Sequence, residues 1–352
     1  MQLFQKIFHS SFSIIPKIRL YLDLGTTNTR IAIENKGLLL NEPTCIGLNK
    51  QTNQYIFYGK EAKTIIGKTP DFIKIIKPLS SGVIVDFDGT VALLKYFIGK
   101  AVQPYLVNYR VIKPTISVTA TVPICATEIE KKAVIECLQK AGCSEIIIIN
   151  KTLATATGSG ANINSHTPCL TVDLGGGLIE IGIVSGGGVI AYRVIKNAGE
   201  VMNKLVMNYA YLKNGIILGE STCDELKINL LRFNQENTTL AVRGKSLENG
   251  LPKSIKMSTN DINEALLTSF NQITDMIKEI VEFVQPEIVE EIYKNGIYLS
   301  GNLAKVPNIN DFFQKELDIN TNLVETYGDT TITGLSKLGQ NKEMLFQLNE
   351  SF

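Results

Sequence analysis

The sequence has no tryptophan, only two histidines and almost no net charge. Its 35 lysines and arginines are matched by 34 aspartates and glutamates, which leaves a formal charge of +1. This balance provides no general attraction to nucleic-acid phosphates, so we expect no nucleic-acid partner. No apolar run reaches the roughly 18–20 residues that a membrane-spanning helix needs, which argues against an integral membrane protein.

Metal-binding cysteine motifs are also missing. None of the six cysteines forms a C-x-x-C pair, and the two histidines are His9 and His166. This pattern argues against a structural zinc site and favours buried, reduced thiols in the cytoplasm. With 352 residues, 44% of them hydrophobic, the chain is long enough for two domains or one duplicated domain.

Residues 1–15 have the spacing of an amphipathic helix that Pro16 would end. Its apolar face would carry Leu3, Phe4, Ile7, Phe8 and Phe12. A secretory signal is disfavoured because a continuous apolar segment and a small-residue cleavage site are both missing. Two interpretations stay open from the residues alone: a helix packed on the protein's own core, or a helix lying in a membrane surface.

A strand–turn–strand unit occurs twice in the chain. IRLYLDLGTTNTRIAI contains Asp23 at the end of its first apolar strand, and CLTVDLGGGLIEIGIVS contains Asp173 at the same place, 150 residues later. Each unit is typical of a β-hairpin and is followed by helical and strand patterns, among them helices over 127–142 and 261–285. The repetition predicts an α/β fold of two similar halves, with one insertion in each.

The two hairpin turns carry groups that suit a phosphate. The first turn offers hydroxyl and amide groups from Thr26, Thr27 and Asn28. The second offers unobstructed backbone N–H groups from Gly175, Gly176 and Gly177. Asp23 and Asp173 would then hold a hydrated Mg²⁺ ion between the turns. The alternative is that both turns are ordinary connections between strands.

The order of these motifs resembles the MreB family of bacterial actins, in the superfamily of actins, sugar kinases and heat-shock chaperones. The similarity runs from about residue 18 to residue 339 and includes the segments LNEPTCIGL, GKEAKTIIGKTP, IKPLSSGVIVDF, TVPICATEIEKKAVIECLQKAG and ILGESTCDELK. The resemblance implies an actin-like α/β fold with two RNase H-like halves and four subdomains around a nucleotide cleft. It also implies binding of ATP or ADP with Mg²⁺.

The resemblance implies a division of the chain into subdomains. Subdomain IA would comprise residues 17–48, 95–165 and 330–352, and subdomain IB residues 49–94. Subdomain IIA would comprise residues 166–213 and 266–329, and subdomain IIB residues 214–265. Residues 1–16 would form the N-terminal amphipathic helix.

Further nucleotide contacts follow from the resemblance. Gly199 and Glu200 would form the ribose-side loop. The adenosine-contacting helix would contribute Asp224, Glu225 and Lys227, and the adenosine loop Ser300, Gly301, Asn302 and Leu303. Asn203 stands where the family usually has aspartate, and Asn302 and Leu303 replace two glycines, which would crowd the base.

Two positions that orient the attacking water in the family are changed: Lys151 stands for glutamate and Leu178 for threonine. A lysine beside phosphates stays protonated, and leucine cannot hydrogen-bond water. We therefore expect ATP binding with weak hydrolysis, and pairing of Lys151 with a phosphate or a nearby acid. In the alternatives, Lys151 points to solvent and Glu130 serves as base in a fully active filament ATPase, or the protein is a phosphotransferase.

The resemblance implies partners as well. The protein would assemble with itself into antiparallel double protofilaments, and other MreB paralogues are candidate partners. It would lie in the cytoplasm at the inner face of the cell membrane, held by residues 1–15 and by a loop of Pro104, Tyr105 and Leu106. Its high content of lysine, isoleucine and asparagine is similar to proteins of wall-less mollicutes, where such filaments would serve shape or motility.

Overall fold

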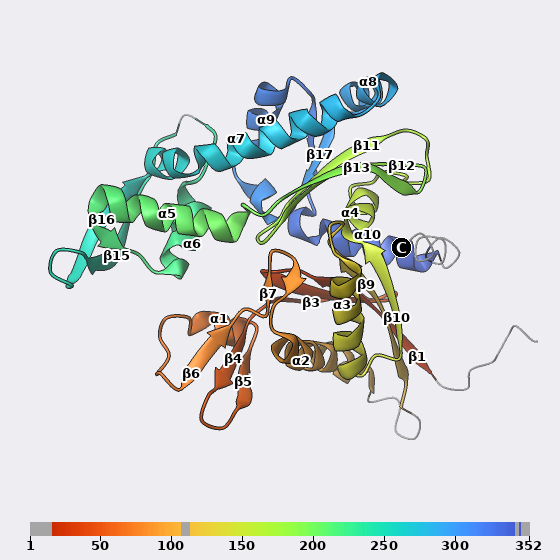
Figure 1. Ribbon diagram of the computed structural model, residues 1–352, viewed down its shortest axis with the longest axis horizontal. Coiled ribbons are helices and arrows are strands. Elements are labelled where there is room, and N and C mark those ends of the chain that lie inside the picture. Colours follow the sequence, from red (N-terminus) through yellow and green to blue (C-terminus); the bar gives the residue numbers. More distant parts are fainter. Residues whose placement is uncertain (1–15, 107–112, 235, 342–344, 346–352) are drawn as a thin grey trace, which may run out of the picture.

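The computed structural model describes residues 16–106, 113–234, 236–341 and 345. Two five-stranded sheets form the centre of the two halves (Figure 1). The first has the order β10-β9-β1-β2-β3, with β1 (Lys17–Leu24), β2 (Asn28–Ile33), β3 (Gly37–Pro43), β9 (Thr115–Val122) and β10 (Glu145–Asn150). The second has the order β13-β12-β11-β17-β18, with β11 (Cys169–Leu174), β12 (Ile179–Ser185), β13 (Gly188–Ile195), β17 (Ile297–Ser300) and β18 (Thr321–Leu323).

Both sheets have the same strand connections. The central strand, β1 or β11, pairs antiparallel with the strand that follows it and parallel with β9 or β17. The next strand outward, β10 or β18, is again parallel. This equivalence confirms the duplication that the repeated hairpins predict, and with it an α/β fold of two similar halves.

Helices cover the outer faces of the two sheets. In the first half these are α2 (Phe87–Leu106) and α3 (Glu128–Lys140), and their buried side chains join the core of the first sheet. In the second half, the outer helices are α5 (Gly199–Asn214), α7 (Thr259–Phe283), α8 (Pro286–Asn295) and α9 (Ile309–Leu317). The expected helix over 261–285 is thus α7, and the helix expected over 127–142 is α3.

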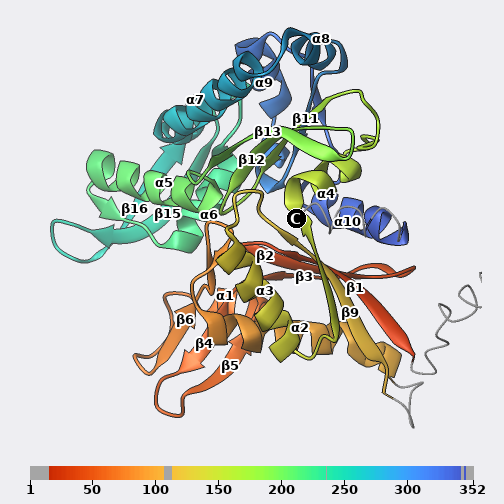
Figure 2. The ribbon, with the colours of Figure 1, turned by 45° about the vertical axis from the view of Figure 1, so that its right-hand side comes forward.

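Two helices, α4 (Lys151–Gly158) and α10 (Thr330–Gln340), lie between the sheets in both views (Figures 1 and 2). Their close contact depends on glycine. A Cβ on Gly334 would lie 1.8 Å from the carbonyl oxygen of Ala154, and one on Gly158 would lie 2.0 Å from that of Thr330. The contact between α4 and α10 is therefore the tightly packed link between the halves.

Each half carries an additional small sheet. The first consists of β4 (Ile46–Asn49), β5 (Gln54–Tyr58) and β6 (Ile73–Ile76), with α1 (Lys60–Thr64) and the pair β7 (Leu79–Ser80) and β8 (Val83–Ile84) nearby. The second consists of β14 (Ile216–Ile217), β15 (Thr239–Ser246) and β16 (Pro252–Ser258), beside α6 (Glu220–Leu230). Two short 3₁₀ helices, η1 (Asn302–Lys305) and η2 (Tyr327–Asp329), complete the described chain.

Two expectations about membrane contact meet the structure differently. The predicted helix over residues 1–15 lies outside the described residues. The loop expected at Pro104, Tyr105 and Leu106 is wrong as a loop, because these residues form the last turn of α2. Among the described residues, no helix has both the length and the apolar character that crossing a bilayer requires.

Candidate functional site

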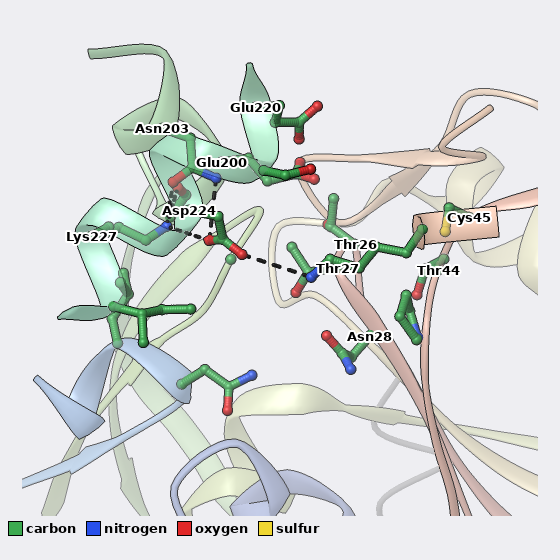
Figure 3. Close-up of a pocket in the computed structure, with 18 of the residues that line it drawn as sticks. Thr26, Thr27, Asn28, Thr44, Cys45, Glu200, Asn203, Glu220, Asp224 and Lys227 are labelled. Carbon is green, nitrogen blue, oxygen red and sulfur yellow. Dashed lines mark hydrogen bonds and ion pairs between the residues drawn. The ribbon is translucent and has the colours of Figure 1, made fainter. Parts of the chain in front are cut away.

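A cavity of about 450 Å³ lies between the two halves. This volume is typical of sites for small organic ligands. In Figure 3, Thr26, Thr27 and Asn28 of the first hairpin face Glu200, Asp224 and other residues of α5 and α6 across it. Its lining includes apolar residues from both halves, among them Ile66, Ile228, Leu303, Val306 and Pro307. Apolar lining of this kind suits a flat, apolar ring.

Lys227 contacts several polar groups on one side of the cavity. Its ammonium donates to the Gly199 carbonyl oxygen at 2.9 Å and to the Asn203 side-chain oxygen at 2.7 Å. It also lies 3.3 Å from Asp224, whose carboxylate accepts from the Asn203 amide (Figure 3). Burial lowers the pKa of Lys227 in spite of Asp224, while Asp224 has a lowered pKa because Lys227 and Lys63 outweigh its own burial. Asn203 therefore takes part in this network although the family usually has aspartate there.

Two lysines from the first half reach acids of the second half across the cavity. Lys63 lies 3.7 Å from Asp224. Lys77 bonds to Glu200 at 3.1 Å and also to Glu220. Burial lowers the pKa of Lys77, but the two glutamates outweigh this and raise it. These ion pairs connect the small sheet of the first half to α5 and α6.

The tips of the two repeated hairpins touch at the inner end of the cavity. A Cβ on Gly176 would lie 2.3 Å from Cγ2 of Thr27, and one on Gly177 would lie 2.2 Å from Oγ1 of Thr26. That same hydroxyl oxygen accepts the Gly82 N–H at 2.8 Å. Side chains at the two glycines would separate the tips, so this close approach requires glycine.

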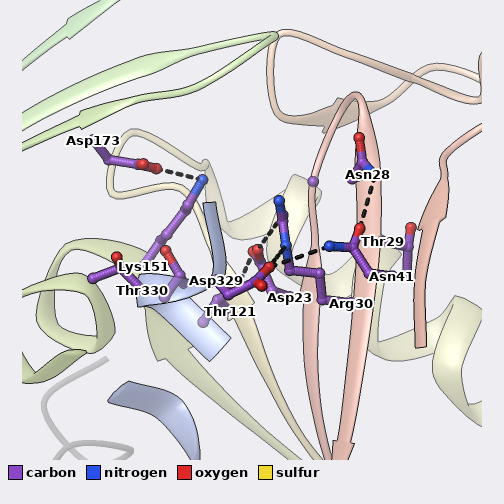
Figure 4. Close-up of polar contacts among 12 residues, drawn as sticks. Asp23, Asn28, Thr29, Arg30, Asn41, Thr121, Lys151, Asp173, Asp329 and Thr330 are labelled. Atoms are coloured by element: carbon purple, nitrogen blue, oxygen red, sulfur yellow. Dashed lines mark hydrogen bonds and ion pairs between the residues drawn. The ribbon is translucent and has the colours of Figure 1, made fainter. Parts of the chain in front are cut away.

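Beyond the tips lies a smaller chamber of about 50 Å³, and Lys151 is its central cation. The Lys151 ammonium is 2.8 Å from Asp173 (Figure 4). It lies 3.9 Å from Glu180, and its side chain is only 17% exposed. Burial alone would lower the pKa of Lys151, but Asp173, Asp23 and Glu180 together raise it well above its usual range. The lysine is therefore charged, and it points into the chamber.

Glu180 is the buried acid on the far side of Lys151. One carboxylate oxygen accepts the Ile124 N–H at 2.9 Å, whereas no described residue donates a hydrogen bond to the other. Burial raises the pKa of Glu180 to about 7, although Lys151 and the bond from Ile124 act in the opposite direction. The chamber thus contains a buried acid whose charged form is disfavoured by burial and favoured by Lys151.

A second buried cation, Arg30, occupies the first-half side of the chamber. Its guanidinium lies 3.3 Å from Asp23 and donates to Asp329 at 2.7 Å (Figure 4). Thr121 donates a hydrogen bond to the other oxygen of Asp23 at 3.1 Å. Asp23 is thus paired with a guanidinium and a hydroxyl. Like Asp173, which is paired with Lys151, it has a cationic side chain as partner.

These contacts test the expected magnesium site. The structure brings Asp23 and Asp173 to one chamber, but each carboxylate already has a cationic side chain as partner, Arg30 or Lys151. The pair as arranged does not fit a hydrated divalent ion, which needs carboxylates that are free to bind its waters.

Most of the other expected contacts line one of the two spaces. The cavity or the chamber is lined by Thr26, Thr27, Asn28, Gly175, Gly176, Gly177, Leu178, Gly199, Glu200, Asp224, Lys227, Gly301, Asn302 and Leu303. Ser300 and Glu225 line neither: Ser300 is fully buried and donates to the Val172 carbonyl oxygen, and Glu225 is exposed on α6.

Glu130, the expected substitute base, is also outside both spaces. Its carboxylate accepts from the backbone N–H and the hydroxyl of Thr127, as the capping box of α3. The alternative in which Lys151 turns to solvent and Glu130 takes over is therefore not the arrangement found.

Sequence reasoning missed Arg30, Glu180, Lys63 and Lys77. A signal existed for the first two, because each is a charged residue within an apolar strand, RIAI or IEIGIVS. Buried charges in such places need partners and often mark functional sites. The two lysines lie in the polar small-sheet insertion, where no local pattern separates them from ordinary surface residues.

The duplicated sheets and the cavity between them define an actin-like protein. Residues 17–347 match the MreB/Mbl protein family. The Bacillus subtilis cell shape-determining protein Mbl is 29% identical over 326 residues, which cover 92% of this chain and 96% of that protein. The Pasteurella multocida cell shape-determining protein MreB is 30% identical over 308 residues, which cover 85% of this chain and 86% of that protein. This chain belongs to the MreB/Mbl family.

Solved structures agree with this assignment. The crystal structure of MreB5 of Spiroplasma citri bound to ADP superimposes with a TM-score of 0.86 at 28% identity, covering 92% of this chain and 96% of that one. The same protein bound to AMPPNP gives a TM-score of 0.86 at 27% identity, with 96% and 99% covered. The MamK double helical filament, at 16% identity and a TM-score of 0.78, shares the fold.

Proposed function

We propose that this protein binds ATP or ADP in the cavity between its halves and assembles into cytoskeletal filaments for cell shape or motility. The observation that carries the nucleotide proposal is the cavity itself, which joins apolar lining residues to the tips of both repeated hairpins. The ADP-bound and AMPPNP-bound forms of S. citri MreB5 support it. Membership of a family with cell shape-determining relatives supports the filament proposal.

Hydrolysis by this protein is proposed to be weak. The position of the missing glutamate holds Lys151 in an ion pair with Asp173, and the position of the missing threonine holds Leu178, which is 5% exposed. The Lys151 ammonium cannot accept a proton from water, and Leu178 cannot hydrogen-bond water at all. A fully active filament ATPase and a phosphotransferase stay alternatives, and measured turnover separates them from this proposal.

The arrangement of the filaments and their location are further proposals. They rest on the family resemblance: antiparallel double protofilaments, contacts with MreB paralogues, and attachment of residues 1–15 to the inner face of the membrane. The four-subdomain division also stays a proposal. In support of it, each half has one large and one small sheet. Two of the expected boundaries differ from the elements, because 48/49 falls within β4 and 94/95 within α2, which packs on the large sheet from Phe87 onward.

Nucleotide binding is tested with a variant that leaves the core unchanged. Ile228 is 70% exposed and lines the cavity, so Ile228→Ser removes apolar surface that a base would cover. Loss of that contact costs about 1–2 kcal/mol, or roughly 5–30-fold in affinity. The matched control is Leu212→Ser, because Leu212 is 81% exposed and is not among the residues that line the cavity.

We expect calorimetry to show ADP binding that is weakened by Ile228→Ser and unchanged by Leu212→Ser. Equal ADP affinity in the two variants would show that ADP does not contact Ile228 in this cavity. No detectable binding of ADP or ATP by the unmodified protein would contradict the proposed function.

A further inference from the structure

The chamber behind the hairpin tips holds its own positive charges. Two carboxylates that would be expected to bind the waters of a metal ion, Asp23 and Asp173, are each paired with a cationic side chain: Asp23 with the buried Arg30 and Asp173 with the partly buried Lys151. Lys151 lines the same chamber as all three glycines of the second hairpin turn, whose N–H groups suit a phosphate.

The place of Lys151 on its own helix is unfavourable. It occupies the first turn of α4, which Asn150 caps by accepting the Thr152 N–H at 2.9 Å. The N-terminus of a helix carries partial positive charge, so a cation there is repelled and an anion is attracted. The contacts of Lys151 with Asp173 and Glu180 offset that repulsion and keep an ammonium group at this point.

We propose that the Lys151 ammonium takes the place of the divalent cation, so that nucleotide binds to this protein without Mg²⁺. The proposal rests on the proposed nucleotide function of the cleft. A phosphate entering between the tips meets an ammonium and the N-terminus of a helix, both of which attract anions. Because Lys151 already neutralises Asp173, adding Mg²⁺ brings little further attraction.

The test compares ADP affinity in Mg²⁺ with that in EDTA, by calorimetry on the full chain. For the unmodified protein we expect the two affinities to agree within about 3-fold. Lys151→Met removes the charge at similar length, so its affinity in EDTA should fall by about 10-fold or more and recover in Mg²⁺. The matched control is Lys132→Met on the exposed surface of α3, which should behave as the unmodified protein does.

The outcomes separate the two proposals. A fall of about 10-fold or more for the unmodified protein in EDTA overturns the Lys151 proposal but leaves nucleotide binding intact. Absence of binding in both buffers contradicts the proposed function instead. If Lys151→Met does not melt cooperatively, Lys151→Arg serves in its place because it keeps the positive charge. We expect the Lys151→Arg variant to bind ADP with equal affinity in Mg²⁺ and in EDTA. If this variant folds but needs Mg²⁺ to bind ADP, the result counts against the proposal.

Discussion

Restoring the two absent water-positioning groups should raise the rate of ATP hydrolysis. The change is Lys151→Glu together with Leu178→Thr, and both positions line the chamber behind the hairpin tips. A positioned base contributes about 10²–10⁴-fold to proton transfer, so we expect the double variant to release phosphate about 100-fold faster than the unmodified protein. Each single variant should gain less than about 10-fold, because both groups hold the same water.

The structure adds a cost to this experiment. Lys151→Glu replaces an ammonium 2.8 Å from Asp173 with a third carboxylate beside Asp173 and Glu180. Breaking a buried ion pair in this way costs about 3–5 kcal/mol of unfolding free energy. The variant should therefore melt at lower temperature, and Mg²⁺ should restore part of the loss by neutralising the acids.

The assay is phosphate release at equal polymer mass, with thermal melting of every variant. The matched control is Lys151→Glu with Leu178→Val, because valine has the shape of threonine without the hydroxyl. We expect the control to hydrolyse no faster than Lys151→Glu alone. Equal rates for the threonine and valine forms, or rapid hydrolysis by the unmodified protein, would refute the reasoning.

Three further predictions concern the surface, the fold and its pH dependence. Replacing Phe4, Ile7 and Phe8 with polar residues should release the protein from anionic liposomes and leave its cooperative melting unchanged. Loss of the cooperative melting transition would show instead that the helix is part of the protein's core. Burial would raise the pKa of Asp261, the capping-box residue of α7, but bonds from Lys213 and Ser258 lower it to about 2. The ionised Asp261 therefore contributes about 1 kcal/mol to the free energy of unfolding above pH ~4, and this contribution is lost as the pH falls towards ~2. In the Asp261→Asn variant, the free energy of unfolding measured in urea should change less with pH over this range. Gly334→Ala should lower the free energy of unfolding by about 2 kcal/mol or more, because the new Cβ would lie 1.8 Å from a backbone oxygen of α4; an unchanged urea midpoint would show that the helices separate freely.

The sequence predicts the sheets well because the repeated hairpins carry their own pattern. The same pattern occurs twice: an apolar strand with an aspartate near its end, Asp23 or Asp173, followed by a turn rich in threonine or glycine. The two sheets built on these hairpins have the same strand connections. The expected loop at 104–106 was suggested by resemblance and is instead the end of α2, whose apolar spacing continues to that point.

The expectation that Lys151 pairs with a phosphate or a nearby acid is confirmed for the acid, but sequence reasoning could not identify the particular partners in the ion pairs of the site. The partners Arg30 and Asp23 stand on neighbouring strands, but Lys151 and Asp173 come from different halves, so only the folded chain brings them together. The same is true of Lys77, whose two acidic partners lie more than a hundred residues along the chain. A charged residue in an apolar strand signals that a partner exists; it does not say which residue that partner is.

The account of this protein as a nucleotide-binding filament protein with weak turnover is tested most directly by one paired measurement. Sedimentation and phosphate release are recorded on the same sample with ATP and Mg²⁺. We predict that the protein pellets as polymer while phosphate release stays far below one equivalent per pelleted subunit during assembly. Protein that stays in the supernatant, or phosphate release that keeps pace with assembly, would contradict the account.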